Sequence, residues 1–107
     1  MVKRLGIATK TSTNTYASVF AKPLISNVDQ LSNFVIQYKE NNVNAVTLKF
    51  LGSNDGTNWQ TIGVETPVLK DGMDYEVITD AWLYFDVHVK STVADAHGNI
   101  TVIVTQG

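Results

Sequence analysis

The chain has 107 residues and a formal net charge of −2, and it contains no cysteine. This length fits one domain with its own hydrophobic core. The composition excludes a disulfide scaffold, a thiolate metal site and a cysteine nucleophile, and without a basic surplus we expect no nucleic-acid partner. Because no apolar run is long enough for a membrane span or a signal peptide, we also expect no membrane partner and no secretion by the common route.

Residues 1–13 are predicted to form either an N-terminal arm or a first edge strand. The segment combines three cations with a short apolar centre and a Thr/Ser-rich end. As an arm, it would add a strand to the open sheet edge of a neighbouring subunit. The residues expected to make that contact are Lys3, Arg4, Leu5, Ile7 and Lys10.

From residue 14 onward, apolar and polar residues alternate in short runs rich in β-branched and aromatic side chains, which is the pattern of half-buried strands. The predicted strands are 14–21, 33–40, 44–53, 58–63, 74–79, 81–91 and 98–106. Asn, Asp and Gly separate most of these runs and favour tight reversals. Segment 23–33 is predicted to cross between two sheets, and it could hold a helical turn beginning near Ser26.

These elements predict an all-β fold, in which residues 14–107 form a single antiparallel β-sandwich of seven or eight short strands. Alternation gives each strand one wet face, which is not expected of a parallel sheet covered by helices. The pattern leaves a jelly-roll-like strand order and a Greek-key order open.

The most organised stretch is FLGSNDGTNWQTI, residues 50–62. Asn54, Asp55 and Gly56 lie between two alternating runs, and an Asp-Gly pair in that position predicts a tight hairpin turn. Trp59 follows and is expected to anchor the hairpin against the core. A calcium loop is the weaker alternative, because Asp55 supplies the only carboxylate of the turn. We therefore predict a structural turn that holds no metal or cofactor.

Strand 81–91 is predicted to turn Leu83 and Phe85 toward the core and to carry an unusual second face. The members of that face are Trp82, Tyr84, Asp86, His88 and Lys90. Two aromatic residues beside three polar ones are typical of protein interfaces and of sugar-stacking platforms. In the alternative interpretation, Trp82 and Tyr84 cover the edge of the core at one end of the sandwich.

Side chains that could carry catalysis are scattered along the chain. The two histidines, His88 and His97, are expected to lie far apart, whereas a zinc site needs three or four ligands. The acidic residues, Glu40 among them, are expected to be solvated, mostly in turns, rather than paired across a cleft. No glycine-rich phosphate loop is present. We therefore predict that the protein is not an enzyme.

The segment GSNDGTNW resembles a Ser-x-Asp-Gly-x-x-Trp hairpin found in short bacteriophage and prophage structural proteins. The resemblance extends from Thr13 to Gln106 and includes the closing segment VKSTVADAHGNITVIVTQG. It implies a capsid decoration protein that binds the major capsid protein on the outer surface of the virion and stabilises the shell. It also implies synthesis in the host cytoplasm and a homo-oligomer, with a trimer as the favoured form. A tail or neck position in the virion stays open.

A second, local resemblance connects the same hairpin to discoidin-like and carbohydrate-binding β-sandwich modules. It implies an alternative function in glycan adhesion, in which Trp59, Trp82 and Tyr84 would stack on sugar rings. The two functions overlap, because a phage surface protein could also bind a host glycan.

Overall fold

The computed structural model describes residues 2–26, 33–80 and 82–107. The fold is all-β, and these ranges contain no helix and hence none that could cross a membrane. The strands are β1 (Lys3–Thr11), β2 (Ala17–Ser18), β3 (Leu24–Ile25), β4 (Phe34–Glu40), β5 (Val46–Ser53), β6 (Gln60–Val68), β7 (Met73–Ile78), β8 (Tyr84–Ser91) and β9 (Asn99–Gln106).

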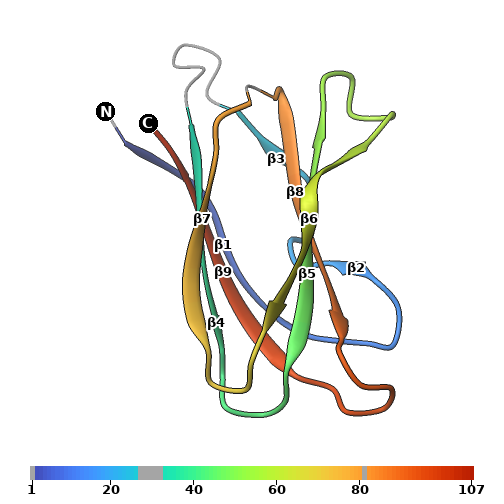
Figure 1. Ribbon diagram of the computed structural model, residues 1–107. Coiled ribbons are helices and arrows are strands. Elements are labelled where there is room, and N and C mark those ends of the chain that lie inside the picture. Colours follow the sequence, from blue (N-terminus) through green and yellow to red (C-terminus); the bar gives the residue numbers. More distant parts are fainter. Residues whose placement is uncertain (1, 27–32, 81) are drawn as a thin grey trace.

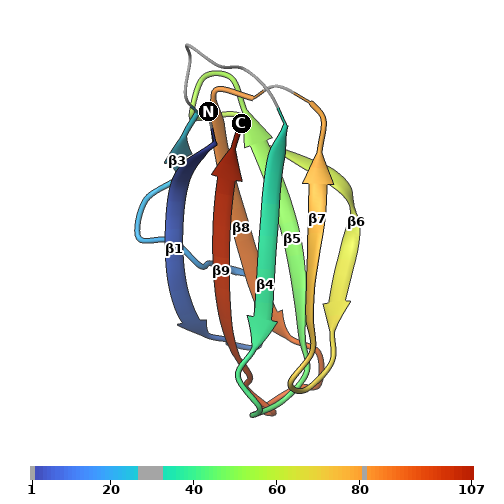
Figure 2. The same ribbon diagram turned by 90° about the vertical axis from the view of Figure 1, so that its left-hand side faces the viewer.

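The strands form two antiparallel sheets packed face to face, as predicted (Figure 1). One sheet has the order β1-β9-β4-β7, which Figure 2 shows face on. The other has the order β2-β8-β5-β6, and β3 also pairs with β8. Because β2 and β3 share one position beside β8, the strands fill eight positions in two sheets. This is the arrangement of a jelly roll, one of the two strand orders that the sequence left open.

The core lies between the sheets and consists mainly of the inward faces of the four central strands. Their buried residues are Phe34, Ile36 and Tyr38 of β4, Val46, Leu48 and Phe50 of β5, Phe85, Val87 and Val89 of β8, and Ile100, Val102 and Val104 of β9. Phe34 and Phe85, from opposite sheets, stack with their ring centroids 4.9 Å apart. Burial of this apolar surface is the main force that holds the two sheets together.

The N-terminal segment forms an edge strand rather than a free arm. β1 pairs with β9 from Lys3, opposite Gln106, to Thr11, opposite Asn99. The residues predicted to form an arm, Lys3, Arg4, Leu5, Ile7 and Lys10, therefore all lie within the sandwich. The physical reason is that part of this segment is apolar on the inner side: Leu5 and Ala8 pack against the core.

Other boundaries differ from the sequence-based expectation in detail. The predicted strand 14–21 is shortened to β2, whereas β6 continues beyond 58–63 to Val68. Leu83 is 38% exposed rather than in the core, because β8 begins only at Tyr84. The helical turn expected to begin near Ser26 falls on residues 27–32, which lie outside the described residues.

Glu40, at the end of β4, is fully buried, which corrects the expectation of a solvated acid. Its carboxylate accepts hydrogen bonds of 2.8 to 3.3 Å from the backbone amides of Val43, Asn44, Asp71 and Asn99. These amides belong to the β4–β5 turn, the β6–β7 turn and the start of β9. Burial raises the pKa of the Glu40 carboxyl, but the four amides favour its ionised form more strongly, and the pKa is lowered.

We predict that Glu40→Gln lowers the free energy of unfolding by about 3 kcal/mol, because glutamine directs an N–H₂ group at amides that need an acceptor. Urea unfolding followed by circular dichroism measures this loss. Glu65→Gln, which alters an exposed carboxylate of β6, is the matched control and should stay within about 0.5 kcal/mol of the parent. Equal losses in the two variants would contradict the role assigned to Glu40.

The same carboxylate predicts how stability depends on pH. The pKa of Glu40 is lowered in the folded state, so its stabilisation is complete above the pKa of an unfolded Glu, about 4.3, and is lost as pH falls toward the folded value. The stability of Glu40→Gln should therefore fall less steeply with acidification than that of the parent. Denaturant unfolding at several pH values measures the two slopes, and identical slopes would refute this assignment.

Candidate functional site

Strand β7 turns its apolar side outward, which is the opposite of what its sequence favours. Its outward residues are Met73, Tyr75 and Val77, and Asp74 and Glu76 alternate with them. Glu76 lies opposite Ile36 of β4, and Asp74 lies opposite Tyr38. Ile36 and Tyr38 are core residues, and directly opposed residues share a face of the sheet. The acidic side of β7 therefore faces the interior, and sequence analysis missed the outward residues because alternation alone assigns them to the core.

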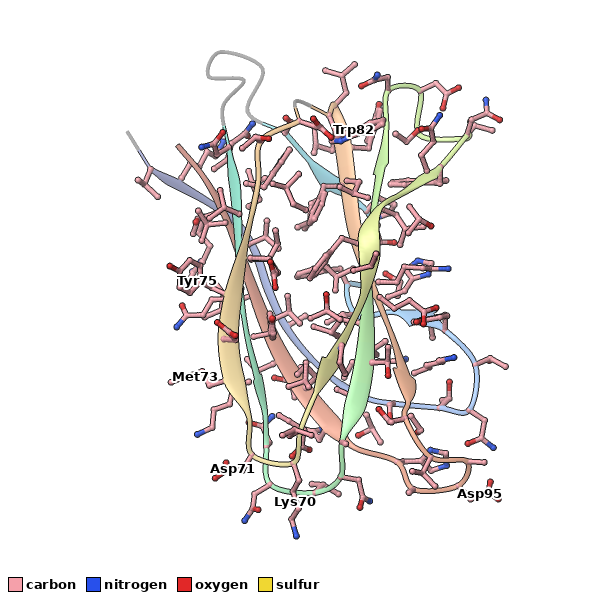
Figure 3. All side chains as sticks on the ribbon, in the orientation of Figure 1. Lys70, Asp71, Met73, Tyr75, Trp82 and Asp95 are labelled. Atoms are coloured by element: carbon pink, nitrogen blue, oxygen red, sulfur yellow. The ribbon has the colours of Figure 1, made fainter. Side chains whose placement is uncertain are left out.

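The outward residues of β7 belong to a larger surface on the four-stranded sheet, which we name the apolar face. Its members are Ile7 of β1, Ile103 of β9, Val35 of β4, and Met73, Tyr75 and Val77 of β7. Figure 3 shows Met73 and Tyr75 pointing away from the other sheet, and these side chains are 66% and 61% exposed. Ile7, at the far edge, is 52% exposed. Exposed apolar side chains on one face of a sheet make this surface a candidate for binding.

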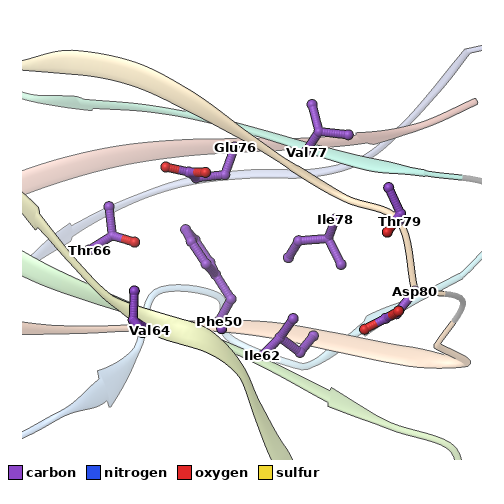
Figure 4. A pocket seen from close by; sticks show the side chains of 10 residues that line it. Phe50, Ile62, Val64, Thr66, Glu76, Val77, Ile78, Thr79 and Asp80 are labelled. Carbon is purple, nitrogen blue, oxygen red and sulfur yellow. The ribbon is translucent and has the colours of Figure 1, made fainter.

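A cleft of about 330 Å³ lies between β6 and β7 (Figure 4). These are the edge strands of the two sheets, and we name this side of the sandwich the open side. Its lining consists of Phe50, Ile62, Gly63, Val64, Thr66, Glu76, Val77, Ile78, Thr79 and Asp80. Phe50 and Ile78 belong to opposite sheets and form part of its apolar floor, whereas Glu76 and Asp80 supply carboxylates. Inward-facing acids on an edge strand are also a known protection against unwanted strand pairing.

The hydroxyl of Tyr38 donates a hydrogen bond of 3.3 Å to Glu76 at the edge of this cleft. Burial raises the pKa of Tyr38 to about 12, and the negative charges of Glu76 and Asp74 add to the effect. The hydroxyl therefore stays protonated at neutral pH and remains a donor. An acidic rim over an apolar floor suits a lysine or arginine side chain, which has an apolar stem and a cationic head.

The opposite edge of the four-stranded sheet is basic. The structure places the predicted arm residues there, along β1, with Lys3, Arg4 and Ile7 exposed and Leu5 and Lys10 half-buried. On the inner side of β1, Leu24 and Phe20 approach Gly6 and close the sandwich at this edge. β1 therefore has a covered inner side and a partner strand on one flank, and no strand of the described residues pairs with its other flank.

The five residues predicted to share an exposed face on strand 81–91 are divided among different environments. Trp82 precedes β8 and turns inward, where its indole ring packs on Gly52 and against the core. Asp86 is buried; it accepts a hydrogen bond of 2.8 Å from Ser18 Oγ, and its Oδ2 lies 3.2 Å from His88 Nε2. Tyr84, His88 and Lys90 are half-buried on the outer side of β8. The predicted single platform does not form.

Tyr16 covers part of the outer side of β8 and β5. The ammonium groups of Lys49 and Lys90 lie 4.4 and 4.9 Å from the centroid of its ring, which are cation–π distances. Burial and the nearby negative charge of Glu65 raise the pKa of Tyr16 to about 12. Sequence analysis did not anticipate that the segment before β2 would lie against this face.

The stretch around Asp55 is a turn between β5 and β6, where Gly56 has a φ of 75°. The carboxylate of Asp55 accepts hydrogen bonds of 2.8 Å from the amides of Thr57 and Asn58, and these bonds lower its pKa. Asn54 Oδ1 accepts a bond of 3.3 Å from the amide of Leu83, and Trp59 is half-buried. The hydrogen bonds of this turn are therefore structural.

His97 and Ser91 form a hydroxyl–imidazole pair, with Oγ and Nδ1 2.9 Å apart. Such a pair can begin a nucleophilic site. Here, however, Ser91 is buried and also bonds to Ser12 Oγ at 2.8 Å, and Ser12 accepts a bond from the amide of Gly98. The chain of bonds fastens the end of β1 to the loop before β9. Within the described ranges, no group of three or more His, Cys, Asp or Glu residues could hold a metal.

Comparison with known proteins shows likeness in the fold. No family model and no curated protein matches the chain. Among solved structures, it is similar to PirA, with a TM-score of 0.66 and 9% identity over 90% of both chains. A protein from the Bacillus endospore appendages described as disulfide-linked pili has a TM-score of 0.58 and 13% identity over 99% of this chain and 86% of that one.

The Yersinia pseudotuberculosis-derived mitogen is a third similar structure, with a TM-score of 0.56 and 18% identity over 95% of this chain and 86% of the mitogen chain. At these identities the likeness extends to the β-sandwich and no further. None of the three is a capsid protein by its name.

We predict that Gly52→Ala displaces the indole of Trp82, because a Cβ atom at this position would overlap the ring. The expected loss in the free energy of unfolding is about 2 kcal/mol, with a red shift in tryptophan fluorescence. A Trp59→Phe background leaves Trp82 as the only indole and makes the shift specific. Thr61→Ala, an exposed site on β6, is the control. An unchanged spectrum in Gly52→Ala would show that Trp82 does not occupy this place.

Proposed function

We propose that this chain is a structural protein of a bacteriophage virion, a capsid decoration protein that acts by binding rather than by catalysis. The resemblance to short phage structural proteins, from Thr13 to Gln106, supports the class of protein. The apolar face supports a role in binding, because it offers a partner a rigid surface on the outside of the sandwich. A tail or neck position belongs to the same proposal.

The apolar face would dock on the major capsid protein at the outer surface of the shell. The six side chains of the apolar face would supply the buried part of this contact. Neighbouring polar residues such as Gln37 and Lys39 would form hydrogen bonds with the capsid protein. A specific interface needs about 1,000 Å² or more of buried surface. A trimer, the oligomer that the resemblance favours, would multiply the contact and clamp neighbouring capsid subunits together.

Glycan binding is the second candidate. The observation that favours it is a shallow hollow of about 400 Å³ lined by Lys22, Pro23, Ile25, Asp55, Gly56 and Tyr84. The ring of Tyr84 lies over Gly56, and a sugar could stack on its free side. Because Trp82 packs on the core, Tyr84 would act without it. A glycan array on which Tyr84→Ala loses a signal that the parent gives would support this candidate.

Co-sedimentation with undecorated capsids tests the main proposal. The capsids should be assembled from the major capsid protein of the phage or prophage that encodes the chain. We predict that the parent co-sediments and that Met73→Ser/Tyr75→Ser weakens binding on the order of 100-fold, because both side chains would be buried in the contact. Failure of the parent to co-sediment would refute the proposal.

Val64→Ser/Leu69→Ser is the matched control for this experiment. It removes two apolar side chains that are even more exposed than Met73 and Tyr75, but from β6 and the turn that follows it, outside the apolar face. We predict unchanged binding for this variant. An equal loss of binding in both double variants would show that general hydrophobicity, and not the apolar face, attaches the protein to the capsid.

A further inference from the structure

The two edges of the four-stranded sheet carry opposite charges. The basic edge is β1, with Lys3, Arg4 and Lys10. The acidic edge is β7 with the two residues beyond its end, and it presents Asp74, Glu76 and Asp80. The β6–β7 turn adds Lys70 and Asp71, whose charges cancel. From this complementarity we propose that a second copy of the chain pairs its β1 with the free edge of β7, so that the sheet continues from one copy into the next. This proposal is independent of capsid binding.

The direction of the strands permits this pairing without turning either copy over. Neighbouring strands in the order β1-β9-β4-β7 are antiparallel throughout. With four strands, β1 and β7 therefore run in opposite directions. A second copy placed beside the first in the same orientation presents its β1 antiparallel to β7. The ladder of hydrogen bonds then continues as an ordinary antiparallel sheet.

The existing register identifies the residues that would meet. Rows of directly paired residues cross the sheet, and one row ends at Ile7 on β1 and at Tyr75 on β7. Another row joins Lys3 to Ile78 in the same way. If the rows continue into the next copy, Ile7 lies directly opposite Tyr75 of the first copy. Two exposed apolar side chains then cover each other across the junction.

The same register pairs the charges on the inner side of the sheet. Lys3 of the second copy lies opposite Ile78 and diagonal to Glu76 and Asp80 of the first. Lys10 belongs to the row that passes through Glu40 to the turn residue Gly72, so it lies diagonal to Asp74. Diagonal neighbours across a strand pair are about 7–8 Å apart, within reach of lysine. The ammonium groups of Lys3 and Lys10 of the second copy therefore lie among the carboxylates of Asp74, Glu76 and Asp80 of the first.

Asp74 has a second function in this arrangement. In the single chain its Oδ1 accepts a hydrogen bond of 2.8 Å from the amide of Tyr75, which occupies one backbone donor of β7. An incoming Lys10 gives the carboxylate a new partner and releases this amide to a carbonyl of the added strand. The Tyr75 amide is thus hydrogen-bonded within the monomer, and it becomes available to an added strand that carries a cation at the matching position.

Charge reversal tests the proposal in solution. Sedimentation velocity at roughly 20 mM salt, where exposed charges are weakly screened, should show the parent associating beyond a dimer, because the contact joins two different edges. Lys3→Glu/Lys10→Glu and Asp74→Lys/Asp80→Lys should each weaken association on the order of 100-fold. Mixing the two variants should restore it, since every junction then pairs opposite charges. A monomeric parent, or a mixture that stays dissociated, would overturn the proposal.

A charge-matched control separates the edges from net charge. Lys22→Glu/Lys39→Glu changes the total charge as much as Lys3→Glu/Lys10→Glu, but these lysines lie in the loop before β3 and in the middle of the sheet. This control should associate as the parent does. Circular dichroism confirms that each variant is folded. Equal dissociation in the control would attribute association to net charge and reject the edge contact.

Disulfide trapping tests the register directly and does not depend on charge, because the parent has no cysteine. Ile7→Cys/Tyr75→Cys should form a covalent ladder of copies on mild oxidation. The two positions cannot pair within one chain, since three strand spacings of about 4.8 Å separate them and a disulfide needs Cα atoms within about 7 Å. Ile7→Cys/Val64→Cys is the control. A ladder in both variants, or in neither, would contradict the proposed junction.

Discussion

The hydrogen bonds of Glu40 fix the register of β7. That register decides which side chains of β7 reach the surface. The Glu40 carboxylate holds the amide of Asp71 at 2.8 Å, and its own amide donates to the carbonyl of Gly72 at 2.9 Å. β7 therefore starts with Met73 opposite Lys39. A shift of one residue would exchange the two faces of the strand. The buried carboxylate thus decides that Tyr75 faces solvent and Glu76 faces the cleft.

Because of this register, one edge strand produces both candidate binding features. Its outward side completes the apolar face, which we propose docks on a partner, and its inward acids line the open side of the sandwich. The basic strand β1 lies at the other edge of the same sheet. Copies joined through β1 and β7 would extend the apolar face from one chain to the next, so self-association would strengthen attachment to a repetitive surface by multivalency.

The sequence predicts the fold class because apolar residues recur at every second position on the four central strands, as Phe34, Ile36 and Tyr38 do on β4. Alternation does not give the observed face of β7, since MDYEVI favours Met73, Tyr75 and Val77 facing inward, whereas the register held by the Glu40 carboxylate turns them outward. Alternation extended past the start of β8 puts Trp82 on the outer side, but its indole packs on the core, as in the alternative interpretation of the sequence. Gly52, a small residue at a core-facing position of β5, was the available signal that a large side chain packs there.

The outward orientation of β7 is the central claim, and thiol labelling of single cysteine variants tests it most directly, since the parent contains no cysteine. Cysteines at positions 75 and 77 should react with a maleimide at nearly the rate of a free thiol, whereas the buried position 78 should be protected on the order of tenfold or more, and position 76, which lines the cleft, should react more slowly than 75 and 77. Fast labelling at 76 and 78 with protection at 75 and 77 would show that β7 has the opposite face outward and would contradict this account.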